Sequence, residues 1–156
     1  MPYQAEIIAV GTELLLGNIA NTNAQFLSQL LASAGVNLLY HTAVGDNPQR
    51  LRAAVETARS RCDLLVFTGG LGPTYDDMTK ETVAGVFGLA LEYHPEVMEE
   101  IQQYFDRVFH RPMPACNRQQ AMLPQGCTVL HNPVGTAPGC IFTAGGVTAV
   151  LLPGVP

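Results

Sequence analysis

Residues 63–87, DLLVFTGGLGPTYDDMTKETVAGVF, give the clearest indication of how this chain folds. The apolar run 63–68 is followed directly by glycines and then by residues with helical spacing. A strand that is apolar on both faces is typical of a buried parallel sheet, because helices cover both sides of such a sheet. The stretch therefore predicts a strand, a glycine-rich turn and a helix over about 78–87.

The same order of elements occurs twice before this stretch. Residues 5–10 and 36–44 have the composition of strands, and each run is followed by glycine. Helices are predicted after each: Asn21 is a suitable N-cap for the first, and Asn47-Pro48 combines an N-cap with a first-turn proline for the second. Alternating strands and helices predict a three-layer α/β/α sandwich around a mostly parallel sheet.

The second half of the chain predicts further, shorter elements. We expect helices over 94–109 and 116–122, strands over 128–131, 139–143 and 147–152, and a hairpin turn at Gly145-Gly146. The last strand ends in the Pro-Gly turn of PGVP, which normally leads into another element. We therefore expect residues 1–156 to be a single domain and the N-terminal part of a longer protein.

Composition narrows the classes of protein. The 156 residues include 8 basic and 13 acidic side chains, a net charge of −5, which argues against a general nucleic-acid binder. Only 13% of residues are charged, which predicts either an apolar surface buried in a homo-oligomer or a deeply buried sheet. The four cysteines are scattered, and we expect them to be reduced and to lie in the core. Without a transmembrane run or a basic leader, the chain is expected to be cytoplasmic, with no membrane partner.

The glycine-rich turn has the composition of a phosphate site. Glycines after a buried strand let backbone N–H groups face an anion, and the following helix adds the positive end of its dipole. The stretch is neither a Walker A loop nor a dinucleotide G-x-G-x-x-G motif. The alternative is a tight turn capped by Asp76 or Asp77. The candidate phosphate-binding residues are Thr68, Gly69, Gly70, Gly72, Thr74, Thr79 and Lys80.

Carboxylates follow the same strands. Glu13 and Asp46 come after the first two predicted strands, and Asp76 and Asp77 follow the third. The carboxyl ends of parallel strands meet at one edge of a sheet, where ligands bind in open α/β folds. Oxygen ligands suit Mg²⁺-type cations that also bind substrate phosphates. The four acids are the candidate metal ligands, with Asp46 and Asp77 as candidate catalytic residues. The alternative is that an aspartate only caps the helix.

Other catalytic chemistry has no support in the sequence. The four histidines, His41, His94, His110 and His131, lack metal-ligand spacing, so we expect structural roles for them. No G-x-S-x-G motif and no Cys-His pattern are present.

Several of these segments resemble the CinA family of competence/damage-inducible proteins. The resemblance covers almost the whole chain and rests on AEIIAVGTELLLG, NTNAQFLSQLL, VGDN, TGGLGPTYDDMTKE, NPVGTAPG and LLPGVP. The family's domain is similar to the molybdopterin-binding fold of molybdenum-cofactor biosynthesis proteins. Those proteins have a TGG-x-G loop, an Asp-x-Thr step that matches Asp77-Met78-Thr79, and a strand-end aspartate that matches Asp46.

The resemblance implies an activity. CinA-type first domains are linked to cleavage of ADP-ribose into AMP and ribose 5-phosphate with a divalent metal ion such as Mg, Mn or Co. The alternative is a non-catalytic module that binds molybdopterin or a nucleotide within a longer protein. Many family members also carry an amidase domain, and that activity is not assigned to these residues.

Overall fold

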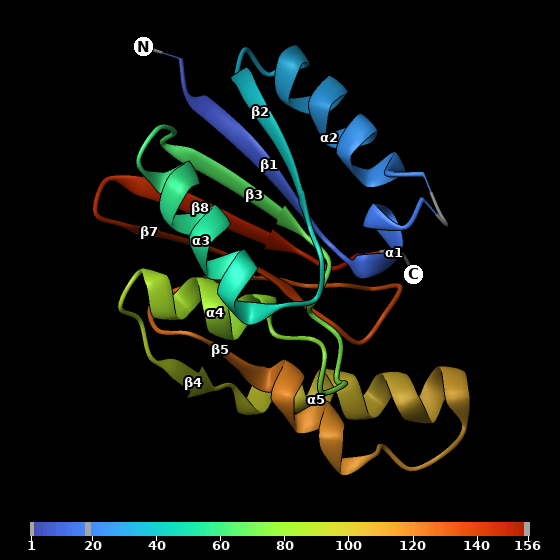
Figure 1. The fold of residues 1–156 in the computed structure, drawn as a ribbon. Helices are drawn as coiled ribbons and strands as arrows, with labels where there is room; N and C mark the ends of the chain where they lie inside the picture. The colour runs from blue at the N-terminus through green and yellow to red at the C-terminus, as the bar shows by residue number, and fades with distance from the viewer. Residues whose placement is uncertain (1, 18–19, 155–156) are drawn as a thin grey trace.

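The computed structural model describes residues 2–17 and 20–154 and has a six-stranded sheet at its centre (Figure 1). The strand order is β2-β1-β3-β8-β7-β6. Four neighbouring strands are parallel: β2 (Asn37–Val44), β1 (Gln4–Val10), β3 (Leu64–Thr68) and β8 (Val147–Leu152). β7 (Gly139–Ala144) and β6 (Thr128–Leu130) extend the sheet in the antiparallel sense. The mostly parallel sheet confirms the predicted class.

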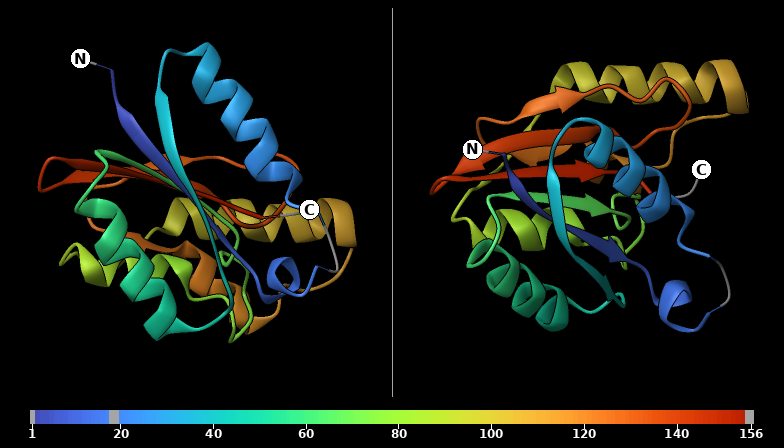
Figure 2. Two further views of the ribbon diagram at one scale, coloured as in Figure 1. Left: turned by 45° about the horizontal axis from the view of Figure 1, so that its top comes forward. Right: turned by 90° about the horizontal axis from the view of Figure 1, so that it is seen from above.

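Helices cover both faces of this sheet and make three layers (Figures 1 and 2). α2 (Thr22–Ser33) packs on one face, where Ile7 and Val66 point. The other face is covered by α3 (Pro48–Arg59), α4 (Thr79–Val86) and α5 (Pro95–Tyr104), over a larger core that includes Ile8 and Phe67. Neighbouring residues of one strand thus enter different cores, because successive side chains alternate between the faces.

The residues expected at the helix ends have the predicted capping roles. The Asn21 side chain accepts a hydrogen bond from the Ala24 N–H, and Asn47 does the same for Arg50. Gly35 follows α2 with φ of 80°, the left-handed conformation that commonly ends a helix. Gly145 and Gly146 also have positive φ and join β7 to β8, which confirms the hairpin.

The largest departure from the predicted elements lies in residues 91–124. The expected helix over 94–109 ends as an α-helix at Tyr104 and continues as a π-helix, η1 (Phe105–Phe109). The second helix is a 3₁₀-helix, η2 (Ala115–Ala121). β4 (Leu91–Tyr93) and β5 (Met122–Pro124) form an antiparallel pair. The sequence did not predict these strands, because three residues are too few to show a periodic pattern. The short helix α1 (Thr12–Leu15) was also not predicted.

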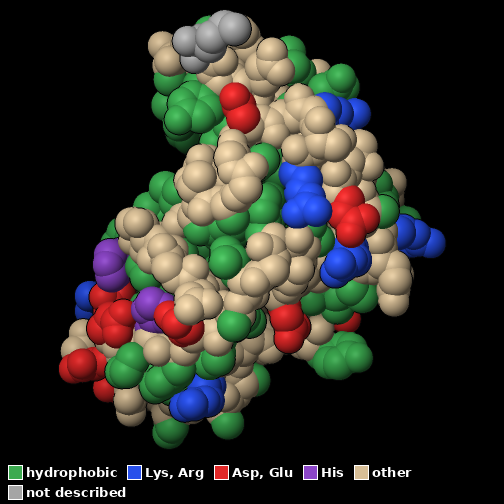
Figure 3. Space-filling view, turned by 90° about the vertical axis from the view of Figure 1, so that its left-hand side faces the viewer, with side chains coloured by type: hydrophobic (Ala, Val, Ile, Leu, Met, Phe, Trp, Pro, Cys, Tyr) green, Lys and Arg blue, Asp and Glu red, His purple; other side chains and the backbone are tan. Residues whose placement is uncertain are grey.

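Few charged side chains are available for the surface, because only 13% of the residues are charged. Among the described residues no helix is long and apolar enough to cross a membrane. On the face shown in Figure 3, basic and acidic side chains both occur among hydrophobic and other side chains. Arg52 and Glu56 form an exposed ion pair on α3. All four cysteines are free, but only Cys62 and Cys140 are buried. Cys116 is exposed, so the expectation that it lies in the core was wrong.

Candidate functional site

The glycine loop, residues 69–77, leaves the carboxyl end of β3 and is held by close backbone packing. Gly69 donates its N–H to the Leu152 carbonyl at 3.1 Å, and a Cβ atom at Gly69 would overlap the Val10 carbonyl. Gly69 and Gly70 have φ of 93° and 72°, which favours glycine. Gly154 approaches from the other side, where an added Cβ would lie 3.1 Å from the Gly69 Cα. The end of β1 and the segment that follows β8 therefore both pack closely against Gly69.

The polar groups of the glycine loop point to two different kinds of partner. The backbone N–H groups of Gly70, Leu71 and Gly72 donate to no atom of the described residues. The carbonyls of Gly72, Thr74 and Asp77 instead accept from Gln119 Nε2, at 3.4, 3.5 and 2.9 Å. Consecutive unpaired N–H groups in a turn are the backbone arrangement that binds anions in proteins. Gln119 therefore occupies three of the loop's carbonyl acceptors, whereas the three consecutive N–H groups stay unpaired.

Thr79 begins α4 directly beneath this loop. Its side chain is fully buried, and its hydroxyl has no hydrogen-bond partner among the described residues. A Cβ atom at Gly70 would overlap that hydroxyl. Buried polar groups without partners are rare in folded proteins, and they often mark a functional site. Thr68 is also buried, at the end of β3, directly before the glycine loop.

Lys80 is a buried cation beside the glycine loop. Its side chain is 8% exposed, and Nζ donates to the Gln119 carbonyl at 2.8 Å. No carboxylate of the described residues lies within ion-pair distance of it, and burial lowers the pKa of Lys80 to about 8. Together with Gly70, Gly72, Asp77 and Gln119, it lines a pocket of about 220 Å³. Glu81 also lines this pocket, so it combines the free N–H donors of the loop and one buried ammonium group with two carboxylates.

Asp77 closes the loop on itself. Its Oδ2 accepts from the Thr74 N–H at 2.9 Å and from the Thr74 hydroxyl at 2.5 Å. α4 begins at Thr79, its N-cap residue is Met78, and no side chain caps it. The alternative in which Asp76 or Asp77 caps the helix is therefore wrong. Asp76 is exposed, and Asp77 is half-buried.

The other two predicted acids lie at the ends of β1 and β2. Asp46 and Thr12 exchange two hydrogen bonds: the Thr12 N–H donates to Asp46 Oδ2 at 3.2 Å, and the Asp46 N–H donates to the Thr12 hydroxyl at 3.0 Å. Glu13 is exposed, and its carboxylate lies over Gly11. Both acids thus belong to the β1–β2 side of the edge.

The four predicted acids do not make a protein-only metal cage. Within residues 2–17 and 20–154, no group of three or more His, Cys, Asp or Glu side chains is arranged to hold a metal ion. Mg²⁺, however, is usually bound by one or two carboxylates together with waters and substrate phosphates. Asp46 is solvent-exposed, and Oδ1 of Asp77 makes no hydrogen bond to the described residues, so each offers an oxygen of the right type. The described residues thus offer single carboxylate oxygens and no assembled cation site.

Gln119 is the residue at this site that sequence reasoning missed. It lies on η2, far along the chain from the loop it contacts, and nothing in its sequence neighbourhood marks it. Its partners are three backbone carbonyls, which leave no trace in side-chain spacing.

Comparison with known proteins places the chain in a family. Residues 6–156 match the family model MoCF_biosynth, described as "Probable molybdopterin binding domain". The chain is 56% identical over 152 residues to a competence-damage inducible protein of Acetivibrio thermocellus and 57% identical over 152 residues to that of Geobacillus kaustophilus. The match covers 97% of this chain in both cases, but only 37% and 36% of the relatives, so the chain spans little more than a third of their length.

Solved structures agree with this placement. The protein CinA of Thermoplasma acidophilum is 36% identical with a TM-score of 0.88, and the match covers 99% of this chain and 90% of that one. MoaB of Thermus thermophilus, a molybdopterin biosynthesis enzyme, is 20% identical with a TM-score of 0.61 over 99% of this chain and 82% of that one. The second likeness shows the fold alone. The chain belongs to the molybdopterin-binding domain family and, within it, to the CinA group of competence/damage-inducible proteins.

Proposed function

We propose that this domain binds a nucleotide diphosphate at the glycine loop and hydrolyses ADP-ribose to AMP and ribose 5-phosphate with a divalent cation. The observation that carries the proposal is the run of unpaired N–H groups at Gly70, Leu71 and Gly72 beside the buried Lys80. Donors and a positive charge in one pocket match the phosphate oxygens of such a ligand. Thr68, Gly69, Thr74 and Thr79 complete the proposed phosphate-binding set.

The proposed reaction is a displacement at phosphorus. A water oxygen forms a new bond to one phosphorus, the bridging P–O bond breaks, and the departing phosphate keeps that bonding electron pair. The protons of the attacking water pass to solvent. The loop N–H groups and Lys80 stabilise the negative charge that develops on the phosphoryl oxygens. Asp46 and Asp77 would hold the cation and orient the water, and Asp76 and Glu13 would serve as accessory ligands. A cation such as Mg, Mn or Co would neutralise charge on the phosphates and make bound water more acidic.

The test is direct assay of the purified chain. AMP and ribose 5-phosphate should appear in equal amounts when ADP-ribose is incubated with Mg²⁺, Mn²⁺ or Co²⁺, and EDTA should stop their release. Gly70→Val is the variant expected to be inactive, because a branched side chain at this position would overlap Thr79 and distort the loop. Turnover by a folded Gly70→Val variant would reject the glycine loop as the phosphate site.

The second candidate is a module that binds molybdopterin or a nucleotide without turnover. It is favoured by Asp77, because Oδ2 of that residue is already engaged by Thr74 and offers the cation one carboxylate oxygen rather than two. Thermal-shift measurements with pterins and nucleotides, with and without divalent ions, separate the candidates. Stabilisation without product release identifies a binding module.

We also propose that the domain self-associates. Phe26 and Leu30 lie one helical turn apart on α2 and are 64% and 52% exposed. Leu15 and Leu16 on α1 are also exposed, as is Leu39 on β2, the edge strand of the sheet. Exposed large apolar side chains of this kind are typical of subunit interfaces. Light scattering should report an oligomer, and Phe26→Glu should reduce its mass.

A further inference from the structure

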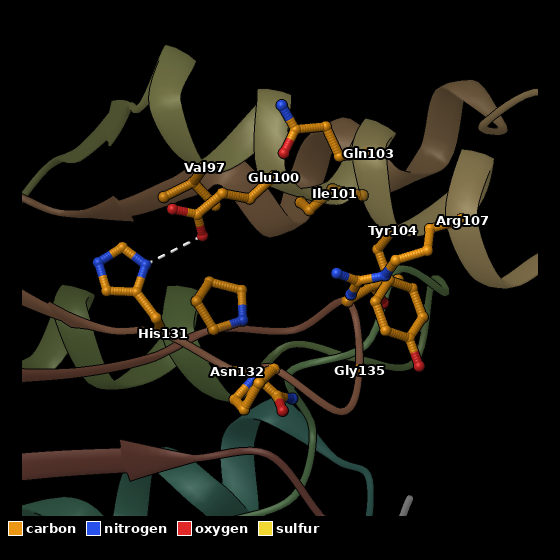
Figure 4. A pocket seen from close by; sticks show the side chains of 12 residues that line it. Val97, Glu100, Ile101, Gln103, Tyr104, Arg107, His131, Asn132 and Gly135 are labelled. Carbon is orange, nitrogen blue, oxygen red and sulfur yellow. Dashed lines mark hydrogen bonds and ion pairs between the residues drawn. The ribbon is translucent and has the colours of Figure 1, made fainter.

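A second cleft opens between α5 and the loop of residues 131–138, which joins β6 to β7 (Figure 4). Its volume is about 350 Å³, a size typical of small-molecule sites. The floor is apolar, since Val97 and Ile101 on α5 are each 1% exposed. The walls are polar: Glu100 and His131 face each other across one end, and Asn132 lies on the loop side.

The wall of this cleft is fixed in place by side-chain hydrogen bonds. Asn132 ties the loop together, because its Nδ2 donates to the Ala137 carbonyl at 2.9 Å and its Oδ1 accepts from the Val134 N–H at 3.1 Å. The Tyr104 hydroxyl donates to the Val134 carbonyl at 3.0 Å. Asn132 and Ala137 belong to the NPVGTAPG segment, which the glycine-loop site does not use. A rigid wall means that a ligand would enter a preformed site.

Glu100 is held at one end of the cleft by His131. Its Oε2 lies 2.9 Å from Nδ1 of His131, while the carboxylate as a whole is half-exposed, with 49% of its side chain accessible. One carboxylate has room for several donors, so the histidine leaves acceptor positions open. The cleft thus offers an apolar floor with an oriented acceptor beside it.

The cleft lies at the same edge of the sheet as the glycine loop. The 131–138 loop joins Leu130, the last residue of β6, to Gly139, the first residue of β7, and these two residues are paired. The next residue of β7, Cys140, pairs with Leu151 near the end of β8. Gly69, at the start of the glycine loop, bonds to the neighbouring Leu152. β3 and β7 are separated only by β8, so the two loops leave the sheet about 10 Å apart. α4 and α5 also cover the same face (Figure 1).

We propose that this cleft binds the ribose at the far end of the ligand, with Glu100 accepting hydrogen bonds from its two neighbouring hydroxyls. This inference rests on the proposed function, because it assumes a diphosphate on the glycine loop. A carboxylate beside a ribose diol is an established way for proteins to recognise that sugar. The apolar floor packs against the carbon face of the ring. Glu100 is then the residue that distinguishes ADP-ribose from ADP.

The test compares binding of ADP-ribose, ADP and AMP by calorimetry, in EDTA and again with Mg²⁺ on ice. The matched variants are Glu100→Gln and Glu99→Gln, because Glu99 is the adjacent exposed glutamate of α5. We expect Glu100→Gln to weaken ADP-ribose about tenfold, since it replaces charged hydrogen bonds, and to leave ADP unchanged. Glu99→Gln should alter neither ligand, and both variants should melt at the wild-type temperature.

The outcomes separate this inference from the function on which it rests. Unchanged ADP-ribose affinity in Glu100→Gln, or equal weakening of ADP-ribose and ADP, overturns the ribose site and leaves the glycine loop assignment standing. Failure of the wild-type chain to bind any of the three nucleotides overturns the proposed function and the ribose site together.

Discussion

The carboxylate of Asp77 and the residue Thr74 close a small ring at the tip of the glycine loop, in which one oxygen, Oδ2, accepts both the backbone N–H at 2.9 Å and the hydroxyl at 2.5 Å. The ring fixes the loop without using the other oxygen. A structural role and a ligand role for Asp77 therefore fall on different atoms, and substitutions can separate them.

Asp77→Asn should keep the fold and lose turnover. The amide oxygen of asparagine can accept the same two hydrogen bonds, so the free energy of unfolding should change by less than about 0.5 kcal/mol. Removal of the negative charge should abolish metal-dependent hydrolysis of ADP-ribose. Urea denaturation and product release check the two effects, with Asp106→Asn, at an exposed position of η1, as the control. Full activity in Asp77→Asn would remove this residue from the proposed machinery.

Asp46→Asn tests the other side of the proposed cation site. An asparagine oxygen can still accept from the Thr12 N–H, so the end of β2 should remain folded and the melting temperature should be nearly unchanged. Turnover should fall at every concentration of Mg²⁺, because a charged ligand is lost. Titration of activity against Mg²⁺ checks this. A wild-type titration curve for Asp46→Asn would assign the residue to the Thr12 pair alone.

Gly70→Ala should destabilise the domain through Thr79. The positive φ of 72° costs an alanine roughly 1 kcal/mol, and the new Cβ atom overlaps the Thr79 hydroxyl. Adding Thr79→Ala removes the overlap, so the double variant should recover part of the loss, with a coupling energy of about 1 kcal/mol. Chemical denaturation of the two single variants and the double variant measures this coupling. Simple additivity would contradict the contact.

The lowered pKa of Lys80 predicts that anion binding depends on pH. Burial lowers the pKa of Lys80 to about 8 from an ordinary value of 10.5, so the ammonium is charged below about pH 8 and loses its proton above it. Affinity for inorganic phosphate should therefore fall as the pH rises above 8, whereas Lys80→Met should bind weakly at every pH. The free energy of unfolding should change in the opposite direction. Between pH 8 and 10.5 only the unfolded chain keeps the Lys80 proton, so the stability of the wild type should rise with pH relative to that of Lys80→Met. Calorimetric titrations and denaturation at several pH values check both trends.

Gln119→Ala should loosen the glycine loop without unfolding the domain. The substitution removes the side-chain donor to the carbonyls of Gly72, Thr74 and Asp77, of which Thr74 keeps the Asp77 N–H, while η2 keeps its backbone contacts. We expect faster amide exchange over residues 70–77 and weaker binding of nucleotide, by about tenfold. Gln125→Ala, at an exposed turn, is the control. Unaltered exchange in the loop would show that the Gln119 contacts do not hold it.

The class of fold and the position of the candidate site could both be predicted from the order of residues. Leu64 to Phe67 are apolar without interruption, which occurs where both faces of a strand are covered, and Asn21, Asn47 and Gly35 mark helix ends by local hydrogen bonding and φ alone. Such features depend on residues a few positions apart, so they can be read along the chain. The occurrence of glycine and acidic residues at the strand ends then predicts this edge of the sheet as the candidate site.

The construction of that edge depends on tertiary packing and could not be predicted. Gln119 reaches the glycine loop from η2, Lys80 is left without a carboxylate partner, and Glu100 meets His131 across a cleft. These contacts join residues that are distant in sequence. Several of the acceptors are backbone carbonyls, which every residue type carries, so side-chain spacing does not reveal them. The order of residues therefore specified which elements form, and packing of those elements against one sheet set which polar groups meet and which stay unpaired.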